Sequence, residues 1–198
     1  MILFGASGHA KVIIDILEGN GVKVEKIYDD NPITDNIFGI GVEHSSRIGE
    51  NKAAIISVGN NTNRKKISEK YKFQYQIAVH KTAAISVHSK IGEGTVVMAN
   101  VAVNPSVEIG KHCIINTGAV LEHDCKISDF AHISPNAALA GNVEVGEGTH
   151  VGIGASVIQG IKIGKWAMIG AGAVVIKDVP DFAVVVGSPA RIIKYNTL

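Results

Sequence analysis

An aliphatic residue recurs at every sixth position across almost half of this chain. From Ile85 to Val175 the sixth residue is always isoleucine, valine or leucine, over sixteen consecutive positions and without an insertion. The residue two places earlier is usually small, as at Ala119, Ala137 and Ala155. Because residues two apart on a strand point to the same side, each six-residue unit predicts a short strand that faces a core twice.

A six-residue period of this kind is typical of a parallel β-helix, a coil with three flat sides. Three units then make one turn of 18 residues, so residues 18 apart stack on neighbouring turns. Glycine and polar residues between the strands are expected to form the corners, and six glycines directly follow an aliphatic position: Gly92, Gly110, Gly146, Gly152, Gly164 and Gly170. The pattern predicts an all-β parallel β-helix over residues 79–180, with residues 181–198 as a cap on its last turn.

Stacking turns the outward residues of the coil into columns. One column alternates in charge on every turn, which favours a solvated face: Lys90, Glu108, Lys126, Glu144 and Lys162. The other two faces, with columns that begin at Val96 and Ala102, are apolar or small. Because large apolar faces are rarely left in water, they predict subunit contacts, and three coils around one axis would cover them. We therefore expect a homotrimer.

The first 78 residues follow a different pattern, in which short apolar runs alternate with helical segments. The expected strands are at residues 2–4, 23–30 and 53–61. One helix is expected after the glycine turn, ending at Gly19 or Gly21, and another at residues 62–72. The first helix places Val12, Ile13, Ile16 and Leu17 on one side. This alternation predicts a small Rossmann-like α/β domain with a parallel sheet over residues 1–78.

Composition narrows the classes of function. With 19% charged residues and a net charge of +1, nothing favours a nucleic acid polymer or an anionic membrane as partner. The chain has no long apolar run and does not begin like a signal peptide, so we expect a cytoplasmic protein without membrane insertion. Cys113 and Cys125 fall on inward small positions at different faces of the coil, which predicts core packing rather than a disulfide.

A glycine turn after the first predicted strand is a candidate phosphate site. Ser7, Gly8 and His9 would place backbone N–H groups at a helix N-terminus, where phosphate binds favourably. Asp29 and Asp30 end the second predicted strand and suit nucleotide hydroxyl or imide groups. The third glycine of the dinucleotide fingerprint is absent, so the turn favours a nucleotide over a dinucleotide. A plain tight turn is the alternative interpretation.

The best catalytic candidate is His123, at an expected corner of the coil. Asp124 follows it, and a carboxylate beside an imidazole can fix the tautomer and raise the basicity of the ring. Gly141 stacks one turn later, where its backbone N–H could hold a thioester carbonyl or the oxyanion formed from it. The alternative is a surface histidine, since the chain has eight histidines. His132 and His150 stack on another face and predict interface or cofactor contact rather than a metal site.

Several segments together resemble the hexapeptide-repeat N-acetyltransferases that complete UDP-N,N′-diacetylbacillosamine, and the related perosamine N-acetyltransferases and sialic acid O-acetyltransferases. The segments are "GASGHAKV", the aspartate pair at 29–30, "VGNNTNRKKI", "VHKTAAIS", "NTGAVLEHDCKISDFAHISPNAALAGNV" and "VVGSPARII". The likeness covers essentially the whole chain. It implies a left-handed coil, acetyl-CoA as co-substrate, no metal, and direct acetyl transfer without a covalent enzyme intermediate.

The resemblance also implies a role for each matching position. His123 would accept a proton from the sugar 4-amino group as its nitrogen attacks acetyl-CoA, with Asp124 supporting the base where the bacillosamine enzyme has glutamate. Substrate contacts would come from Ser7, Gly8, His9, Asp29, Asp30 and Gly59. Acetyl-CoA contacts would come from His132, Gly141, Ile153 and Ala171. The implied function is N-acetylation of a nucleotide-linked 4-amino sugar for surface glycan biosynthesis. O-acetylation of a sugar hydroxyl and a non-catalytic nucleotide-sugar-binding scaffold are the alternatives.

Overall fold

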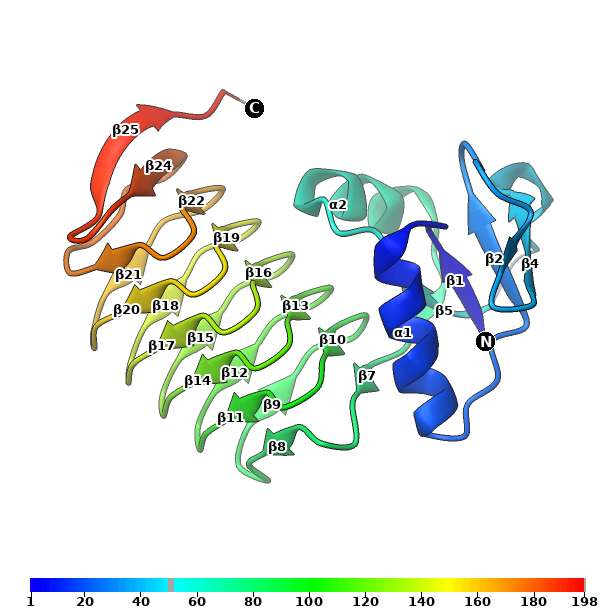
Figure 1. Cartoon of the computed structure of the whole chain (residues 1–198), viewed down its shortest axis with the longest axis horizontal. Helices are drawn as coiled ribbons and strands as arrows, with labels where there is room; N and C mark the ends of the chain where they lie inside the picture. The colour runs from blue at the N-terminus through cyan, green and yellow to red at the C-terminus, as the bar shows by residue number, and fades with distance from the viewer. Residues whose placement is uncertain (50–51, 198) are drawn as a thin grey trace.

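The computed structural model describes residues 1–49 and 52–197 and shows an α/β region packed beside a long coil of short strands (Figure 1). The α/β region comprises β1 (Ile2–Phe4), α1 (Gly8–Gly19), β2 (Lys26–Asp29), β3 (Asn36–Ile37), β4 (Ile40–His44), the 3₁₀ turn η1 (Ser45–Arg47), β5 (Ala53–Ile56), α2 (Asn61–Lys70) and β6 (Gln74–Tyr75). Its sheet has the order β3-β4-β2-β1-β5-β6, and all pairs except β3–β4 are parallel. The expected Rossmann-like alternation is confirmed.

Several details of this region differ from the prediction, including the third strand, which was expected over residues 53–61 and ends at Ile56. The antiparallel pair β3–β4 was not expected, because β3 has only two residues and carries no alternating pattern. On α1, Val12 is 39% exposed, whereas Ile14 is fully buried. The reason is that α1 packs against both the sheet and the coil, since Ile13 and Ile14 share one apolar cluster with Leu3 and Ile114. Burial on two sides makes the apolar face wider than a single stripe.

The coil consists of two-residue strands that occur every six residues. They are β7 (Ala78–Val79), β8 (Ala84–Ile85), β9 (Lys90–Ile91), β10 (Val96–Val97), β11 (Ala102–Val103), β12 (Glu108–Ile109), β13 (Ile114–Ile115), β14 (Val120–Leu121), β15 (Lys126–Ile127), β16 (His132–Ile133), β17 (Ala138–Leu139), β18 (Glu144–Val145), β19 (His150–Val151), β20 (Ser156–Val157), β21 (Lys162–Ile163), β22 (Met168–Ile169) and β23 (Val174–Val175). The expected left-handed parallel β-helix is confirmed.

Each strand pairs in parallel with the strand three places later, so partners are 18 residues apart, as Leu121 and Leu139 are. Three sheets result, which we call the docked face (β7 to β22), the open face (β8 to β23) and the charged face (β9 to β21). Both cysteines lie inside the coil as free thiols, and burial raises the pKa of Cys113 to about 12. The core-packing assignment of the cysteines is confirmed.

The docked face corrects one expectation. The column that begins at Val96 was assigned to subunit contact, but the α/β region of the same chain covers its first turns (Figure 1), whereas Met168 near its end is 43% exposed. Val96 and Ile114 pack in one cluster with Ile13 and Leu17 of α1. Sequence spacing identified an apolar face correctly but could not distinguish a neighbouring subunit from a neighbouring domain. The open face lies on the far side of the coil from α1 in Figure 1.

The corners also differ from the expectation. From Ile91 to Ile169 the left-handed backbone conformation occurs three residues after each aliphatic position, for example at Asp124 (φ 63°) and Asn142 (φ 58°), and not at the glycines directly after it. Those glycines let successive turns approach one another. A Cβ on Gly146 would lie 2.5 Å from the backbone of Gly164. The glycines directly after the aliphatic positions therefore indicate close packing between turns. The corner positions themselves are mostly Gly, Asn or Asp, the residue types that adopt the left-handed conformation most readily.

The chain leaves the six-residue period near its end. β24 (Ala183–Val186) extends the docked face beside β22, and β25 (Arg191–Tyr195) returns antiparallel to β24. At the other junction, β6 belongs to the α/β sheet and β7 to the coil. Among the residues described, neither helix has the length and apolar character that a membrane span requires.

Candidate active site

His123 lies at the corner between the open and charged faces, in the turn after β14. Its Nδ1 is 2.8 Å from Oδ2 of Asp124, and both side chains are well exposed, 64% and 58% respectively. An ionised carboxylate can only accept, so Asp124 receives the Nδ1–H and leaves Nε2 as the basic nitrogen of the neutral ring. The pair is therefore direct and has the geometry of an oriented general base.

Gly141 lies directly beneath the imidazole, one turn further along the coil. A Cβ built on Gly141 would be 2.6 Å from Nε2 and from Cε1 of His123. The backbone carbonyl of His123 also accepts from the N–H of Asn142 at 2.9 Å, which fixes the two corners against each other. Any side chain at position 141 would displace the ring, so glycine is required for this arrangement.

Three of the residues assigned to acetyl-CoA share one position in the repeat with His123. Gly141, Ile153 and Ala171 each lie two places after a buried aliphatic residue, at a corner of the coil. Within residues 1–49 and 52–197, their backbone N–H groups donate to no protein acceptor. Ile153 and Ala171 stack at the corner between the docked and open faces, where Gly172 N–H donates to the carbonyl of Ile153. These unsatisfied donors suit the amide and carbonyl groups of a pantetheine arm.

A pocket of about 430 Å³ opens at the carboxyl ends of β1 and β2. It is lined by Phe4, Gly5, Ser7, Asp29, Asp30, Asn31, Val58, Asn63, Lys66 and Ile67. Three of the residues assigned to the nucleotide, Ser7, Asp29 and Asp30, therefore meet here. Asp29 already accepts from the N–H of Ala6 at 2.8 Å, and Asp30 accepts from the Ser45 hydroxyl. Both carboxylates retain further lone pairs for a ligand.

Gly8 and Gly59, which were also assigned to the substrate, directly follow the pocket residues Ser7 and Val58. Gly8 begins α1, and no heavy atom of a neighbouring element lies within 4 Å of its Cβ position. Gly59 lines a second hollow of about 380 Å³ on the coil side of α2, together with His150 and Trp166. Sequence analysis missed Asn63 and Lys66, although their place just after the third predicted strand marks them as pocket residues.

His9 and His132 lie in the contact between the α/β region and the docked face. Burial, with the charge of Arg64, lowers the pKa of His9 to about 4, and burial, with His150 nearby, lowers the pKa of His132 to about 3. The His132 and His150 rings stack at 4.6 Å, and His132 Nε2 is 3.0 Å from the Asn116 amide. In the described part of the chain, neither His9 Nε2 nor His132 Nδ1 has a hydrogen-bond partner.

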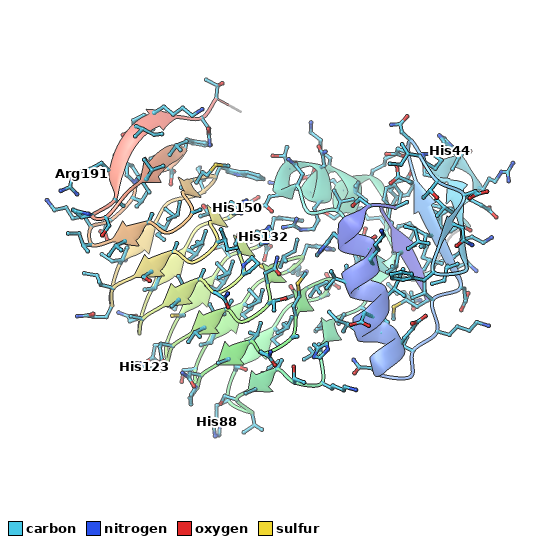
Figure 2. The ribbon with its side chains drawn as sticks, viewed as in Figure 1. His44, His88, His123, His132, His150 and Arg191 are labelled. Carbon is cyan, nitrogen blue, oxygen red and sulfur yellow. The ribbon has the colours of Figure 1, made fainter. Side chains whose placement is uncertain are left out.

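Within one chain the candidate residues fall into separate places. Figure 2 shows His123 on the side of the coil that points away from the α/β region, whereas His132 and His150 lie toward it. The nucleotide-sized pocket is on the α/β region, and the pair of His123 and Asp124 is on the opposite corner. A single protomer therefore does not bring the base to the pocket.

Comparisons with known proteins show the family of this chain. The family described as the PglD N-terminal domain matches residues 1–71, and the bacterial transferase hexapeptide family (six repeats) matches residues 88–123. A mutant of perosamine N-acetyltransferase from Caulobacter crescentus, in complex with CoA and GDP-perosamine, superimposes with a TM-score of 0.91 at 37% identity. That match covers 96% of this chain and 95% of the other.

Two further solved structures match over nearly the full length. The acetyltransferase domain of PglB from Neisseria gonorrhoeae, in complex with acetyl coenzyme A, has a TM-score of 0.90 at 33% identity. WeeI from Acinetobacter baumannii has a TM-score of 0.88 at 28% identity. Each match covers 97% of this chain and 98% of the other. Comparison with curated protein sequences gives no match.

Proposed function

Because this chain belongs to the hexapeptide-repeat acetyltransferases with a PglD-type N-terminal domain, we propose that it acetylates the 4-amino group of a UDP-linked amino sugar for surface glycan biosynthesis. It is an acetyltransferase with acetyl-CoA as co-substrate. The observation that carries the choice of acceptor is the combination of two features: a nucleotide-sized pocket with two carboxylates and a corner imidazole with an adjacent carboxylate.

The proposed mechanism is direct transfer. The sugar amine attacks the thioester carbonyl, and Nε2 of His123 accepts the proton that the nitrogen loses as the C–N bond forms. The backbone N–H of Gly141, which lies beside the imidazole, stabilises the oxyanion. Collapse of the tetrahedral intermediate breaks the C–S bond, and the imidazolium returns its proton to the departing CoA thiolate. Asp124 holds the ring in the tautomer that this sequence of steps requires.

The active site is proposed to lie between protomers of a homotrimer. In one chain the base lies on the far side of the coil from the pocket (Figure 2), so the His123 corner of one protomer must face the α/β region of its neighbour. The open face supports this arrangement, because its outward column is small and mostly apolar: Ala102, Val120, Ala138, Ser156 and Val174.

The acceptor is tested by offering acetyl-CoA with UDP-linked 4-amino-sugars, GDP-perosamine, and hydroxyl acceptors such as sialic acid, and following CoA thiol release. We expect turnover with the amino acceptors and the highest kcat/KM with a UDP-linked one. Turnover only with a hydroxyl acceptor would replace the proposal by O-acetylation. No turnover with any acceptor, while the nucleotide still binds, would indicate a non-catalytic scaffold. A higher kcat/KM with the GDP-linked sugar would change the assigned nucleotide from UDP to GDP and leave the rest of the proposal unchanged.

A further inference from the structure

Arg64 of α2 is a fully buried cation with 1% exposure, and its partners are neutral. All five of its N–H donors are used. Nε donates to the carbonyl of His112 at 2.7 Å, and Nη1 donates to those of Val58 at 3.0 Å and Gly59 at 3.1 Å. Nη2 donates to Oδ1 of Asn61 at 2.8 Å and to the carbonyl of Phe130 at 2.9 Å. In the described part of the chain, no carboxylate pairs with this guanidinium.

The acceptors on the coil form a regular ladder. His112, Phe130 and Gly148 are 18 residues apart, so their carbonyls stack at the corner between the charged and docked faces, roughly 4.8 Å apart. Arg64 takes the first two, and Nδ2 of Asn61 donates to the third at 3.0 Å. Asn61 and Arg64 are three residues apart and so lie on the same side of α2. Two side chains of one helix therefore bond three successive turns.

The other end of this contact is the wall of the nucleotide pocket. Val58 and Gly59, whose carbonyls Arg64 holds, form the turn between β5 and α2. Val58 lines the pocket, and Asn63 and Lys66 of α2 line it as well. The same helix thus carries pocket residues on one side and the coil ladder on the other. A shift of α2 along the coil would move the pocket by the same amount.

Aromatic packing surrounds the ladder. The rings of His112 and Phe130 stack at 5.3 Å, and Tyr75 meets His112 edge-on at 4.4 Å. Lys65 Nζ lies 5.9 Å from the Phe130 ring and 5.6 Å from the ring of Trp166, the only tryptophan of the chain. Aromatic contacts of this kind tolerate small shifts of α2 along the coil. The planar guanidinium, with its fixed donor directions, can bond the stacked carbonyls in only one register. Packing supplies contact area, and the hydrogen bonds set the position.

We propose that Asn61 and Arg64 are positioning residues that fix the nucleotide pocket at one height along the coil. This inference rests on the proposed function. If acceptor and acetyl donor are held by different regions, the distance between the sugar amine and the thioester depends on how the α/β region sits on the coil. A misplacement of about 1 Å can cost about 100-fold in rate. Asn61 and Arg64 touch neither reactant in this scheme and act only through α2.

The test uses the full-length protein with Asn61→Ala and Arg64→Lys. Asn61→Ala removes the bond to Gly148 and the Oδ1 acceptor of Arg64 Nη2. It leaves the Arg64 bonds to Val58 and Gly59 in place. We therefore expect kcat for the amino sugar to fall at least 10-fold, while Kd for free UDP and KM for acetyl-CoA stay within twofold. Arg64→Lys keeps the charge but loses the planar set of five guanidinium donors. We therefore expect a larger fall in kcat together with weaker UDP binding. Arg47→Lys, at an exposed arginine, and Glu69→Ala, on the exposed side of α2, are the controls.

Fluorescence of Trp166 provides a readout that does not depend on turnover. Because this ring lies beside Lys65 at the contact, release of α2 should shift its emission to longer wavelength in Asn61→Ala and not in Glu69→Ala. Unchanged kcat in Asn61→Ala, or a fall in kcat matched by an equal loss of UDP affinity, would overturn the proposal. If the wild-type protein acetylates no amino sugar, the proposed function fails first. In that case, an unshifted Trp166 emission in Asn61→Ala would overturn the positioning role of Asn61 and Arg64, and a shifted emission would support it.

Discussion

Two corners of the coil have a similar backbone turn but place a histidine in opposite environments, one buried and one exposed. The corner beneath α2 contains His112, and the corner between the open and charged faces contains His123. His112 is 4% exposed, stacks on Phe130, and has its pKa lowered to about 4 by burial and the nearby Arg64 charge. His123 is 64% exposed and is paired with Asp124. The two histidines occupy neighbouring positions of the repeat, since His112 is three places after an aliphatic residue and His123 is two places after one. The cover over each corner decides whether an imidazole packs or can exchange protons.

The largest expected effect is on the exposed corner. We predict that His123→Ala lowers kcat about 10²- to 10⁴-fold, because proton removal from the attacking amine loses its base. Steady-state kinetics with acetyl-CoA and the amino sugar measure this, and the oligomeric state by light scattering should not change. His88→Ala is the matched control, since His88 is an exposed histidine at the same corner two turns earlier. Equal rates for His123→Ala and the wild type would remove the base assignment.

A smaller effect is expected from the turn beneath that imidazole. A Cβ at position 141 would come within 2.6 Å of the His123 ring, so Gly141→Ala must rotate the ring away from its present position. We predict a fall in kcat of about 10- to 100-fold with little change in Tm, because the displaced ring is at the surface and a 1 Å misplacement is costly.

The control for this change is Gly19→Ala, whose Cβ position has no heavy atom within 4 Å. Its rate should match the wild type. If Gly141→Ala kept full activity, the base would not need its position above residue 141, and the oxyanion role proposed for that N–H would also lose its geometric support.

Most of the coil could be predicted from the sequence, because a six-residue period leaves one consistent register. The pairing of Leu121 with Leu139 and the placement of His123 above Gly141 both follow from counting 18 residues. The α/β region could be predicted less completely. A two-residue strand such as β3 has no pattern of its own, and burial of Ile14 depends on a second surface packed on α1.

The site could be predicted only in parts for the same reason. Ser7, Asp29 and Asp30 follow from the glycine turn and the strand ends, and they meet in one pocket. Arg64 was not singled out, because a charged residue in a polar helix usually faces solvent. Its burial depends on carbonyls of His112 and Phe130, which are 48 and 66 residues away. No local pattern contains that information.

The smallest expected effect concerns the buried histidine of the covered corner. In the unfolded chain an imidazole protonates near pH 6.5, whereas folded His112 stays neutral until about pH 4. Between these values the unfolded chain binds more protons, so the free energy of unfolding falls as the pH falls. Each such histidine contributes up to ~1.4 kcal/mol per pH unit. His9 and His132 act in the same direction.

His112→Phe should remove one of these contributions and keep the stacking on Phe130, since Phe130 adopts the same left-handed conformation. Arg64, Glu93, Asp129 and Lys111 act electrostatically on His112 and remain in the variant. Urea unfolding at pH 7.5, 6 and 5 should give a shallower pH dependence than in the wild type, with kcat at pH 7.5 unchanged within twofold. Parallel curves for the two proteins would mean that this imidazole already titrates in the folded state, and the contrast between the two corners would then rest on exposure alone.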